Sequence, residues 1–132
     1  MGGGKRVLQG IVSIGTGDGA FFMSLEPYII SMEKSLGYIP FKGTLNLKVN
    51  RQEAKTFIGS LDLIQINGFK KGIKQFGKVC SYPCRISQIK CAIVIPEFTR
   101  YGPEIVEVIS EANLRQSLGI KNVDKIILEA IK

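Results

Sequence analysis

Short apolar segments, separated at close intervals by glycine, proline and asparagine, set the strongest limit on how this chain can fold. Many of them alternate apolar and polar residues, which is typical of β-strands with one buried face. In L-N-L-K-V, for example, Leu45, Leu47 and Val49 alternate with Asn46 and Lys48. Because such segments outnumber the helical ones and glycine-rich turns join them, the pattern predicts a mainly β fold, a small closed barrel with short helices.

The apolar pattern also gives approximate boundaries for the elements. We expect strands over residues 6–14, 41–49, 61–66, 69–82 (a bent pair), 83–89, 91–95, 104–109 and 123–131, the last with helix as an alternative. We expect helices over residues 24–36 and 51–58, and from 110 or 113 to 118. Asn50 is a suitable cap, and Gly37 and Gly119 are suitable C-terminal stops. The pair Asn67-Gly68 predicts a β-hairpin.

Length and composition favour one folded unit. The chain has 132 residues, of which 45% are hydrophobic, enough for a core and too many for a disordered segment. We therefore expect a single domain over residues 1–132, with residues 1–5 as a disordered or added start. No apolar run approaches the roughly 18 residues of a membrane-spanning helix, and the N-terminus lacks an apolar signal core. We expect a cytoplasmic monomer without membrane contact.

The cysteine and histidine content narrows the chemistry. The chain has three cysteines, Cys80, Cys84 and Cys91, and no histidine. An odd cysteine count does not indicate a disulfide framework, and a zinc site needs four ligands, so we expect buried thiols. Without histidine, Ser-His-Asp and Cys-His nucleophile schemes are excluded. If the chain is an enzyme, acid–base catalysis must then use carboxylates, lysine or tyrosine, or catalysis relies mainly on positioning of the substrates and on a metal ion.

The net charge of +7 is concentrated in the middle of the chain. No acidic residue lies between Asp62 and Glu97, whereas six of the 18 basic residues do. These six are Lys70, Lys71, Lys74, Lys78, Arg85 and Lys90. A local positive field attracts phosphorylated ligands or nucleic acid. Lysines on a solvated strand face give the same pattern, so both interpretations stay open.

A glycine-rich segment is the first candidate binding motif. G-T-G-D-G-A, from Gly15 to Ala20, follows the first expected strand and has glycine at three of five positions. Successive glycine amides can hold an anion, although a tight hairpin turn uses the same residues. The segment is neither a Walker A motif nor a complete dinucleotide fingerprint.

Thr44 and Asn46 form the second candidate motif. They lie two residues apart on an expected strand, which places their side chains on one face. A hydroxyl and an amide oxygen suit Mg²⁺ when phosphates and water complete its coordination. The alternative is that Thr44 and Asn46 simply lie on the solvent-exposed face of an ordinary strand.

Several motifs, in this order and spacing, resemble the archaeal CTP-dependent riboflavin kinases. They are G-T-G-D-G-A-F-F (15–22), S-L-E-P-Y (24–28), L-G-Y-I-P-F-K-G-T-L-N-L (36–47), A-I-V-I-P-E-F-T (92–99), E-I-V-E-V-I (104–109) and N-L-R (113–115). The resemblance covers the chain from about residue 9 to its end. It implies a six-stranded cradle-loop barrel. It also implies transfer of the γ-phosphate of CTP to the 5′-hydroxyl of riboflavin with Mg²⁺, giving FMN and CDP.

The same resemblance implies roles for single residues. Two segments are expected to bind the nucleotide: Thr16, Gly17, Asp18, Gly19, Ala20 and Phe21, and then Ala112, Asn113, Leu114 and Arg115. Thr44 and Asn46 are expected to hold Mg²⁺, and Thr99 and Glu107 to contact the flavin. Glu107 either accepts the proton of the flavin hydroxyl as general base or only hydrogen-bonds the ribityl chain.

Two other functions are kept as alternatives. A nucleic-acid-binding barrel fits the basic segment and a pI near 9.5, and small barrels of this kind include DNA-binding regulators. A salt-dependent complex with duplex DNA, without flavin binding, would support it. A flavin-binding protein without catalysis would instead bind flavin and show no turnover of CTP. The resemblance itself implies no nucleic-acid partner for this domain.

Overall fold

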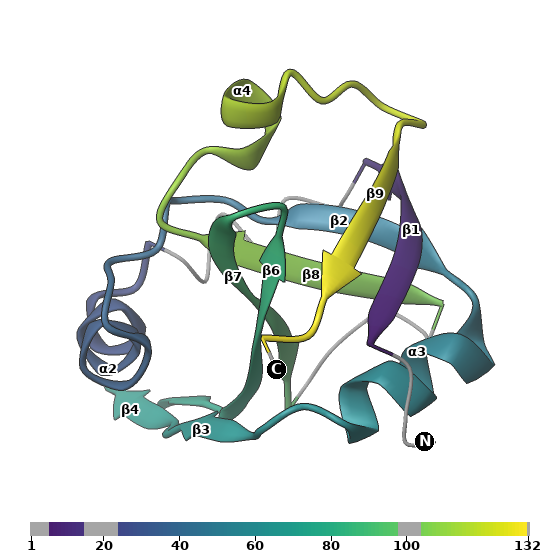
Figure 1. Cartoon of the computed structure of the whole chain (residues 1–132). Coiled ribbons are helices and arrows are strands. Elements are labelled where there is room, and N and C mark those ends of the chain that lie inside the picture. The colour runs from purple at the N-terminus through teal and green to yellow at the C-terminus, as the bar shows by residue number, and fades with distance from the viewer. Residues whose placement is uncertain (1–5, 15–23, 98–103, 132) are drawn as a thin grey trace.

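Six antiparallel strands close into a barrel in the computed structural model, which describes residues 6–14, 24–97 and 104–131. The strands follow the order β6-β7-β8-β2-β1-β9, and β9 pairs again with β6 through Arg85 and Glu129. Figure 1 shows this ring of strands. Their bounds are β1 (Val7–Ser13), β2 (Leu45–Val49), β6 (Val79–Ile86), β7 (Ile89–Pro96), β8 (Ile105–Ser110) and β9 (Lys125–Glu129). The predicted mainly β, six-stranded barrel is confirmed.

The alternating apolar residues of each strand fill the inside of the barrel. Leu45, Leu47 and Val49 of β2 join the inner core together with Val106 and Val108 of β8. The residues between them, such as Asn46 and Glu107, therefore belong to the outer face of the barrel. Strand β1 approaches β2 closely at Gly10, where a Cβ atom would lie 2.9 Å from the Cβ of Leu47.

A second apolar cluster lies outside the barrel, under helix α2 (Glu26–Leu36). Tyr28 and Met32 of α2 pack with Ala92 and Val94 of β7 and with Ile109 of β8. Strand β3 (Ile64–Ile66) extends the sheet beyond β6, and β4 (Phe69–Lys71) pairs with β5 (Lys74–Phe76) in a separate hairpin. Figure 1 shows α2 beside β3 and β4. Part of the outer face of the barrel is thus covered by apolar side chains.

The predicted helices are confirmed to within two residues, except that the third begins at Asn113 and not at the alternative start, Ser110, which ends β8. Helix α2 ends at Gly37, whose φ of +86° fits glycine. Helix α3 (Arg51–Gly59) begins at Asn50, whose side chain accepts a hydrogen bond from the Glu53 amide at 2.9 Å. Helix α4 (Leu114–Leu118) is capped by Asn113 and ends at Gly119. No helix in the described part of the chain is long and apolar enough to cross a membrane.

Several local predictions are wrong. The boundary expected between residues 82 and 83 lies inside one continuous strand, β6 (Val79–Ile86). Asn67-Gly68 does not form a hairpin, because β3 pairs with β6 while β4 pairs with β5. Gly68 is instead a point of close packing, where a Cβ atom would collide with the backbone oxygen of Phe76. The expected strand over 41–49 begins only at Leu45, since Gly43 has a φ of +137°, which is incompatible with a continuous strand.

Candidate functional site

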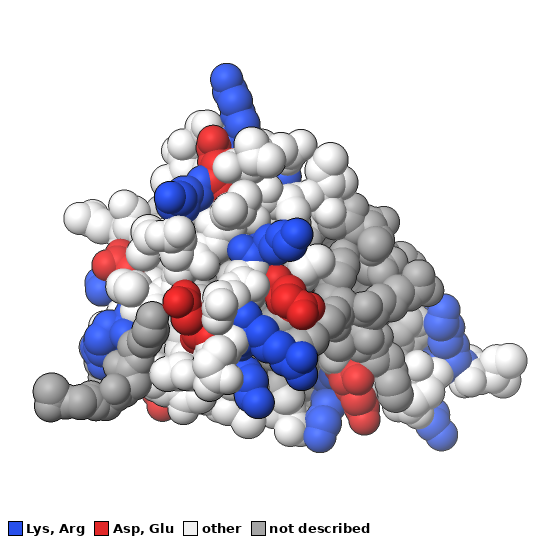
Figure 2. Space-filling view, turned by 90° about the vertical axis from the view of Figure 1, so that its right-hand side faces the viewer, with Lys and Arg blue, Asp and Glu red and all other residues white. Residues whose placement is uncertain are grey.

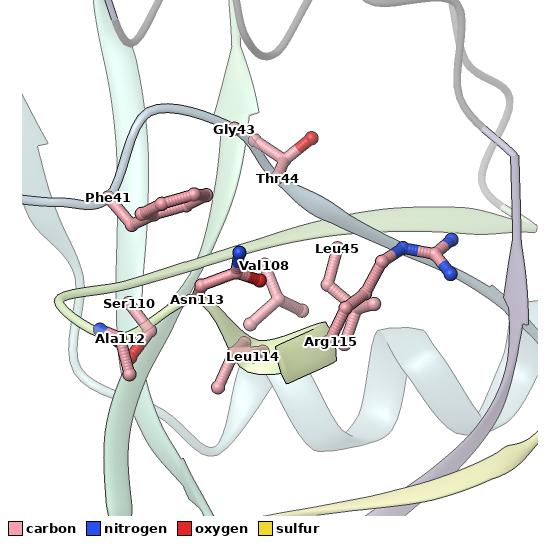
Figure 3. A pocket seen from close by; sticks show the side chains of 10 residues that line it. All are labelled: Phe41, Gly43, Thr44, Leu45, Val108, Ser110, Ala112, Asn113, Leu114 and Arg115. Carbon is pink, nitrogen blue, oxygen red and sulfur yellow. Dashed lines mark hydrogen bonds between the residues drawn. The ribbon is translucent and has the colours of Figure 1, made fainter. Parts of the chain in front are cut away.

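A pocket of about 190 Å³ lies between the segment that leads into β2 and the start of α4. Its lining residues are Phe41, Gly43, Thr44, Leu45, Val108, Ser110, Ala112, Asn113, Leu114 and Arg115. Figure 3 shows Phe41 and Thr44 on one side and Asn113 and Arg115 on the other. The pocket thus brings one expected metal ligand, Thr44, next to the expected nucleotide-binding segment 112–115.

Backbone geometry and local hydrogen bonds hold the two sides of this pocket. The Phe41 amide donates to the Ser110 carbonyl oxygen at 2.7 Å, and the bend at Gly43 then turns the chain into β2. The Ser110 hydroxyl donates to the Lys90 carbonyl oxygen at 2.7 Å and accepts a bond from the Ala112 amide at 3.3 Å. The pocket walls are therefore fixed to the ends of β7 and β8.

The four residues of segment 112–115 do different things. Leu114 is buried in the inner core, so it anchors α4 to the barrel. The Asn113 side chain accepts a hydrogen bond from the Gln116 amide at 3.3 Å, which fixes the first turn of α4. Arg115 Nη2 donates to Asn122 Oδ1 at 2.9 Å. Asn122, which the sequence did not single out, thereby holds the only basic side chain that lines this pocket among the described residues.

The strand registers align six residues in one row across the outer face of the sheet, which we call the outer row. The row runs Ile64, Ser81, Val94, Glu107, Asn46, Ser13, each paired with the next. Residues directly opposite each other on neighbouring strands have their side chains on the same face. The expected flavin residue Glu107 and the expected metal ligand Asn46 are therefore direct neighbours.

A hydrogen bond joins the expected metal and flavin residues. Thr44 Oγ1 donates to Glu107 Oε2 at 3.1 Å across 63 positions of sequence. Glu107 is only 6% exposed and Asn46 only 7% exposed. Because a buried carboxylate is costly without hydrogen bonds, Thr44 contributes to holding Glu107 at this position. The structure thus brings Thr44, Asn46 and Glu107 into one polar cluster.

The residues present fit a magnesium ion. Asn46 Oδ1 is buried and has no hydrogen-bond partner among the residues that the structure describes. An amide oxygen only accepts, so a cation satisfies it. Thr44 supplies a second neutral oxygen on the same strand. Within the described residues, no group of three or more Cys, Asp or Glu side chains has the geometry of a metal site. A pair of neutral oxygens suits Mg²⁺ only where substrate phosphates supply further ligands.

Sequence reasoning missed Ser13, Phe41, Ser110 and Asn122. Ser13 lies beside Asn46 through strand pairing, and Ser110 lines the pocket at the end of β8; no local motif marks either position. The expectations for residues 1–5, for Thr16, Gly17, Asp18, Gly19, Ala20 and Phe21, and for Thr99 lie outside the described residues.

The six basic residues of the middle segment do not line this pocket. Lys70, Lys71 and Lys74 are exposed on the β4–β5 hairpin, and Lys90 is exposed on β7. The Lys74 ammonium lies 5.4 Å from the centre of the Phe76 ring. Figure 2 shows basic and acidic side chains interspersed on the face in view. On that face the charge distribution is mixed, which does not favour a nucleic-acid interface there.

Comparison with known proteins identifies relatives over nearly the whole chain. Residues 12–130 match the family CTP-dep_RFKase, described as domain of unknown function DUF120. A riboflavin kinase of Methanoregula boonei is 43% identical over 129 residues, which are 96% of this chain and 58% of that protein. A riboflavin kinase of Archaeoglobus fulgidus is 42% identical over 131 residues, 97% of this chain and 56% of that protein. The chain thus spans little more than half the length of these relatives.

Proposed function

Because the chain belongs to the CTP-dependent riboflavin kinase domain family, we propose that it transfers the γ-phosphate of CTP to the 5′-hydroxyl of riboflavin, giving FMN and CDP. One observation supports this most strongly. Thr44, which is proposed to bind the metal and the phosphates, is hydrogen-bonded to Glu107, which is proposed to contact the flavin. Direct phosphoryl transfer needs the donor phosphate and the acceptor hydroxyl side by side.

We propose that Thr44 and Asn46 hold Mg²⁺ together with the phosphates of CTP. The bound ion would neutralise negative charge on the transferred phosphoryl group. Both protein ligands are uncharged, so they leave the positive charge of the ion for the phosphates. The buried, unpaired Oδ1 of Asn46 supports this role, because without a ligand it is an unsatisfied acceptor.

The nucleotide is proposed to lie along the pocket of Figure 3. Arg115, held by Asn122, carries a positive charge that can pair with phosphate. Asn113 Oδ1 accepts from the Gln116 amide, so its NH₂ group is the part that can donate to an acceptor of cytosine. A site that hydrogen-bonds the polar edge of one base rejects a mismatched base strongly. Selection of CTP over purine nucleotides would then arise at Asn113 and its neighbours.

Glu107 is proposed to act on the acceptor. It pairs with Asn46 across the sheet and accepts a hydrogen bond from Thr44, so its carboxylate would lie at the junction of the two substrates. There it can accept the proton of the 5′-hydroxyl as that oxygen attacks phosphorus. The alternative is that Glu107 only orients the ribityl chain, and a substitution described in the Discussion separates the two roles.

The test is FMN formation from riboflavin and Mg²⁺, run in parallel with CTP, ATP, GTP and UTP. We expect product with CTP and at least tenfold less with the other donors, consistent with discrimination by hydrogen bonds. Product mainly with ATP would support the kinase activity and contradict the proposed cytosine-binding site. Flavin binding without product would indicate a non-catalytic flavin protein. With neither product nor flavin binding, salt-dependent binding of duplex DNA becomes the next assay.

A further inference from the structure

We propose that Ser13 is a further ligand-binding residue of the nucleotide site, whose hydroxyl donates to a phosphate oxygen of the metal-bound nucleotide. This inference rests on the proposed function. It adds a residue on a third strand, β1, to a site whose other described residues lie on β2, on β8, in the segment that leads into β2 and at the start of α4. No sequence motif assigns Ser13 this role; its position in the barrel does.

Strand register puts Ser13 beside Asn46. The two residues are direct partners in the β1–β2 pair, so their side chains lie on the same face, with Cβ atoms about 4.5–5.5 Å apart. Val12, the preceding residue, belongs to the inner core, which puts Ser13 on the outer face. Ser13, Asn46 and Glu107 are therefore three consecutive polar members of the outer row.

Two neighbouring atoms of this row are buried and unsatisfied. Within the described part of the chain, neither Ser13 Oγ nor Asn46 Oδ1 has a hydrogen-bond partner, although both atoms are shielded from solvent. A hydroxyl donates readily to an amide oxygen, yet these two groups do not bond to each other. Unpaired buried polar groups are costly and uncommon in folded proteins. Two such atoms side by side indicate a binding site for a ligand that contacts both.

The chemistry of the two atoms defines that ligand. The amide oxygen of Asn46 can only accept, so it suits a cation or water bound to a cation. The hydroxyl of Ser13 can also donate, so it suits an anionic oxygen. A divalent cation bound to a di- or triphosphate presents both groups at adjacent positions. The pair of orphaned atoms therefore fits a metal–polyphosphate unit better than it fits either ion alone.

Ser81 provides a matched control within the same row. Ser81 lies on β6, three strands away from Asn46 on β2, and is fully buried. Its hydroxyl donates a hydrogen bond to the Ile64 carbonyl oxygen at 2.6 Å. The two serines share residue type, face and row, and differ in whether the hydroxyl has a partner. Ser13→Ala and Ser81→Ala should therefore have opposite effects.

The experiment measures CDP binding in the presence of Mg²⁺ by calorimetry, riboflavin binding, and thermal unfolding of the free chain. For Ser13→Ala we expect a melting temperature equal to or above that of the wild type, because an unsatisfied hydroxyl is removed. We expect CDP affinity to fall on the order of tenfold, as for loss of one hydrogen bond to a charged group. Riboflavin affinity should not change, and Ser13→Thr, which keeps the hydroxyl, should bind CDP within a few-fold of wild type.

For Ser81→Ala we expect a lower melting temperature and unchanged CDP affinity. Wild-type CDP affinity in Ser13→Ala would overturn the role of Ser13 alone. A Ser13→Ala chain that is destabilised and loses CDP and riboflavin affinity equally would show a purely structural serine, which also overturns it. Absence of Mg²⁺-dependent CDP binding in the wild type would overturn the proposed function, and this inference with it.

Discussion

Each half of the outer row contains one serine, and the hydroxyl groups of the two serines are in opposite states. In one half Ser81 donates to the Ile64 carbonyl oxygen, and its neighbour Val94 is covered by α2 in a cluster with Tyr28 and Met32. In the other half, neither the Ser13 hydroxyl nor the side-chain oxygen of Asn46 beside it has a hydrogen-bond partner among the described residues. The row is one geometric feature with two differently built halves.

The difference separates stability from binding. The half on β3, β6 and β7 satisfies its polar groups internally and buries its apolar ones under a helix, as a stable core requires. The half on β8, β2 and β1 keeps a buried carboxylate and two unpaired polar atoms, an arrangement that costs stability. Sites for ligands are often maintained at such a cost. Substitutions in the two halves should therefore affect different measurements.

The largest effect is expected in the polar half, from Glu107→Gln. The substitution keeps the size and the hydrogen-bonding reach of the side chain but removes its ability to take a proton. If Glu107 is the general base, kcat at saturating riboflavin and CTP should fall about 100-fold or more, with both affinities nearly unchanged. A kcat within a few-fold of wild type would leave Glu107 only an orienting role.

Met32→Ala tests the apolar half. Met32 is fully buried under α2, so its truncation should lower the free energy of unfolding by about 2–5 kcal/mol. Urea denaturation measures this loss, and KM for CTP, determined at a temperature where the variant stays folded, should not change. A variant with wild-type stability and weakened CTP binding would show that the two halves are not separate in function.

Asn46→Ala should have a smaller effect that is confined to the metal. The concentration of Mg²⁺ needed for half-maximal activity should rise on the order of tenfold, as expected for loss of one contact to a charged ligand. Because Asn46 Oδ1 has no protein partner, the free chain should keep its stability. An unchanged Mg²⁺ titration would remove Asn46 from the metal site.

The smallest effect is expected from Tyr38→Phe, which concerns an unpaired hydroxyl outside the outer row. Burial raises the pKa of Tyr38 above its ordinary value of 10.0, and Cys91, Cys84 and Glu111 raise it further. A raised pKa in the folded state means that the contribution of Tyr38 to stability is complete below pH 10 and is lost as the pH rises beyond it.

Tyr38→Phe removes both the titration and an unsatisfied hydroxyl. Urea denaturation at pH 7 should show stability unchanged or raised by up to about 1 kcal/mol, and the variant should lose less stability than wild type above pH 10. CDP affinity should stay at the wild-type value. A clear loss of stability at pH 7 would mean that the Tyr38 hydroxyl is satisfied in solution.

Sequence patterns predicted the features that depend on neighbouring residues. The alternation in L-N-L-K-V assigned Leu47 to the inside of the barrel and Asn46 to its outside, and Asn50 and Gly37 marked helix ends correctly. The Asn67-Gly68 signal failed because a turn motif cannot tell whether its flanking strands pair with each other. Ser13 and the contact between Thr44 and Glu107 depend on strand register across distant segments, which no local pattern encodes.

The most direct measurement of the difference between the two halves uses Mn²⁺ in place of Mg²⁺ and NMR spectra of the isotope-labelled chain with CDP. Line broadening by Mn²⁺ falls steeply with distance, and neighbouring strands lie about 4.8 Å apart. We predict CDP-dependent broadening that is strongest at Asn46 and its neighbours Ser13 and Glu107, and that decreases through Val94 and Ser81 to Ile64. Broadening centred on Ser81 and Ile64, or broadening that does not require CDP, would contradict the assignment of the polar half to the metal–nucleotide site.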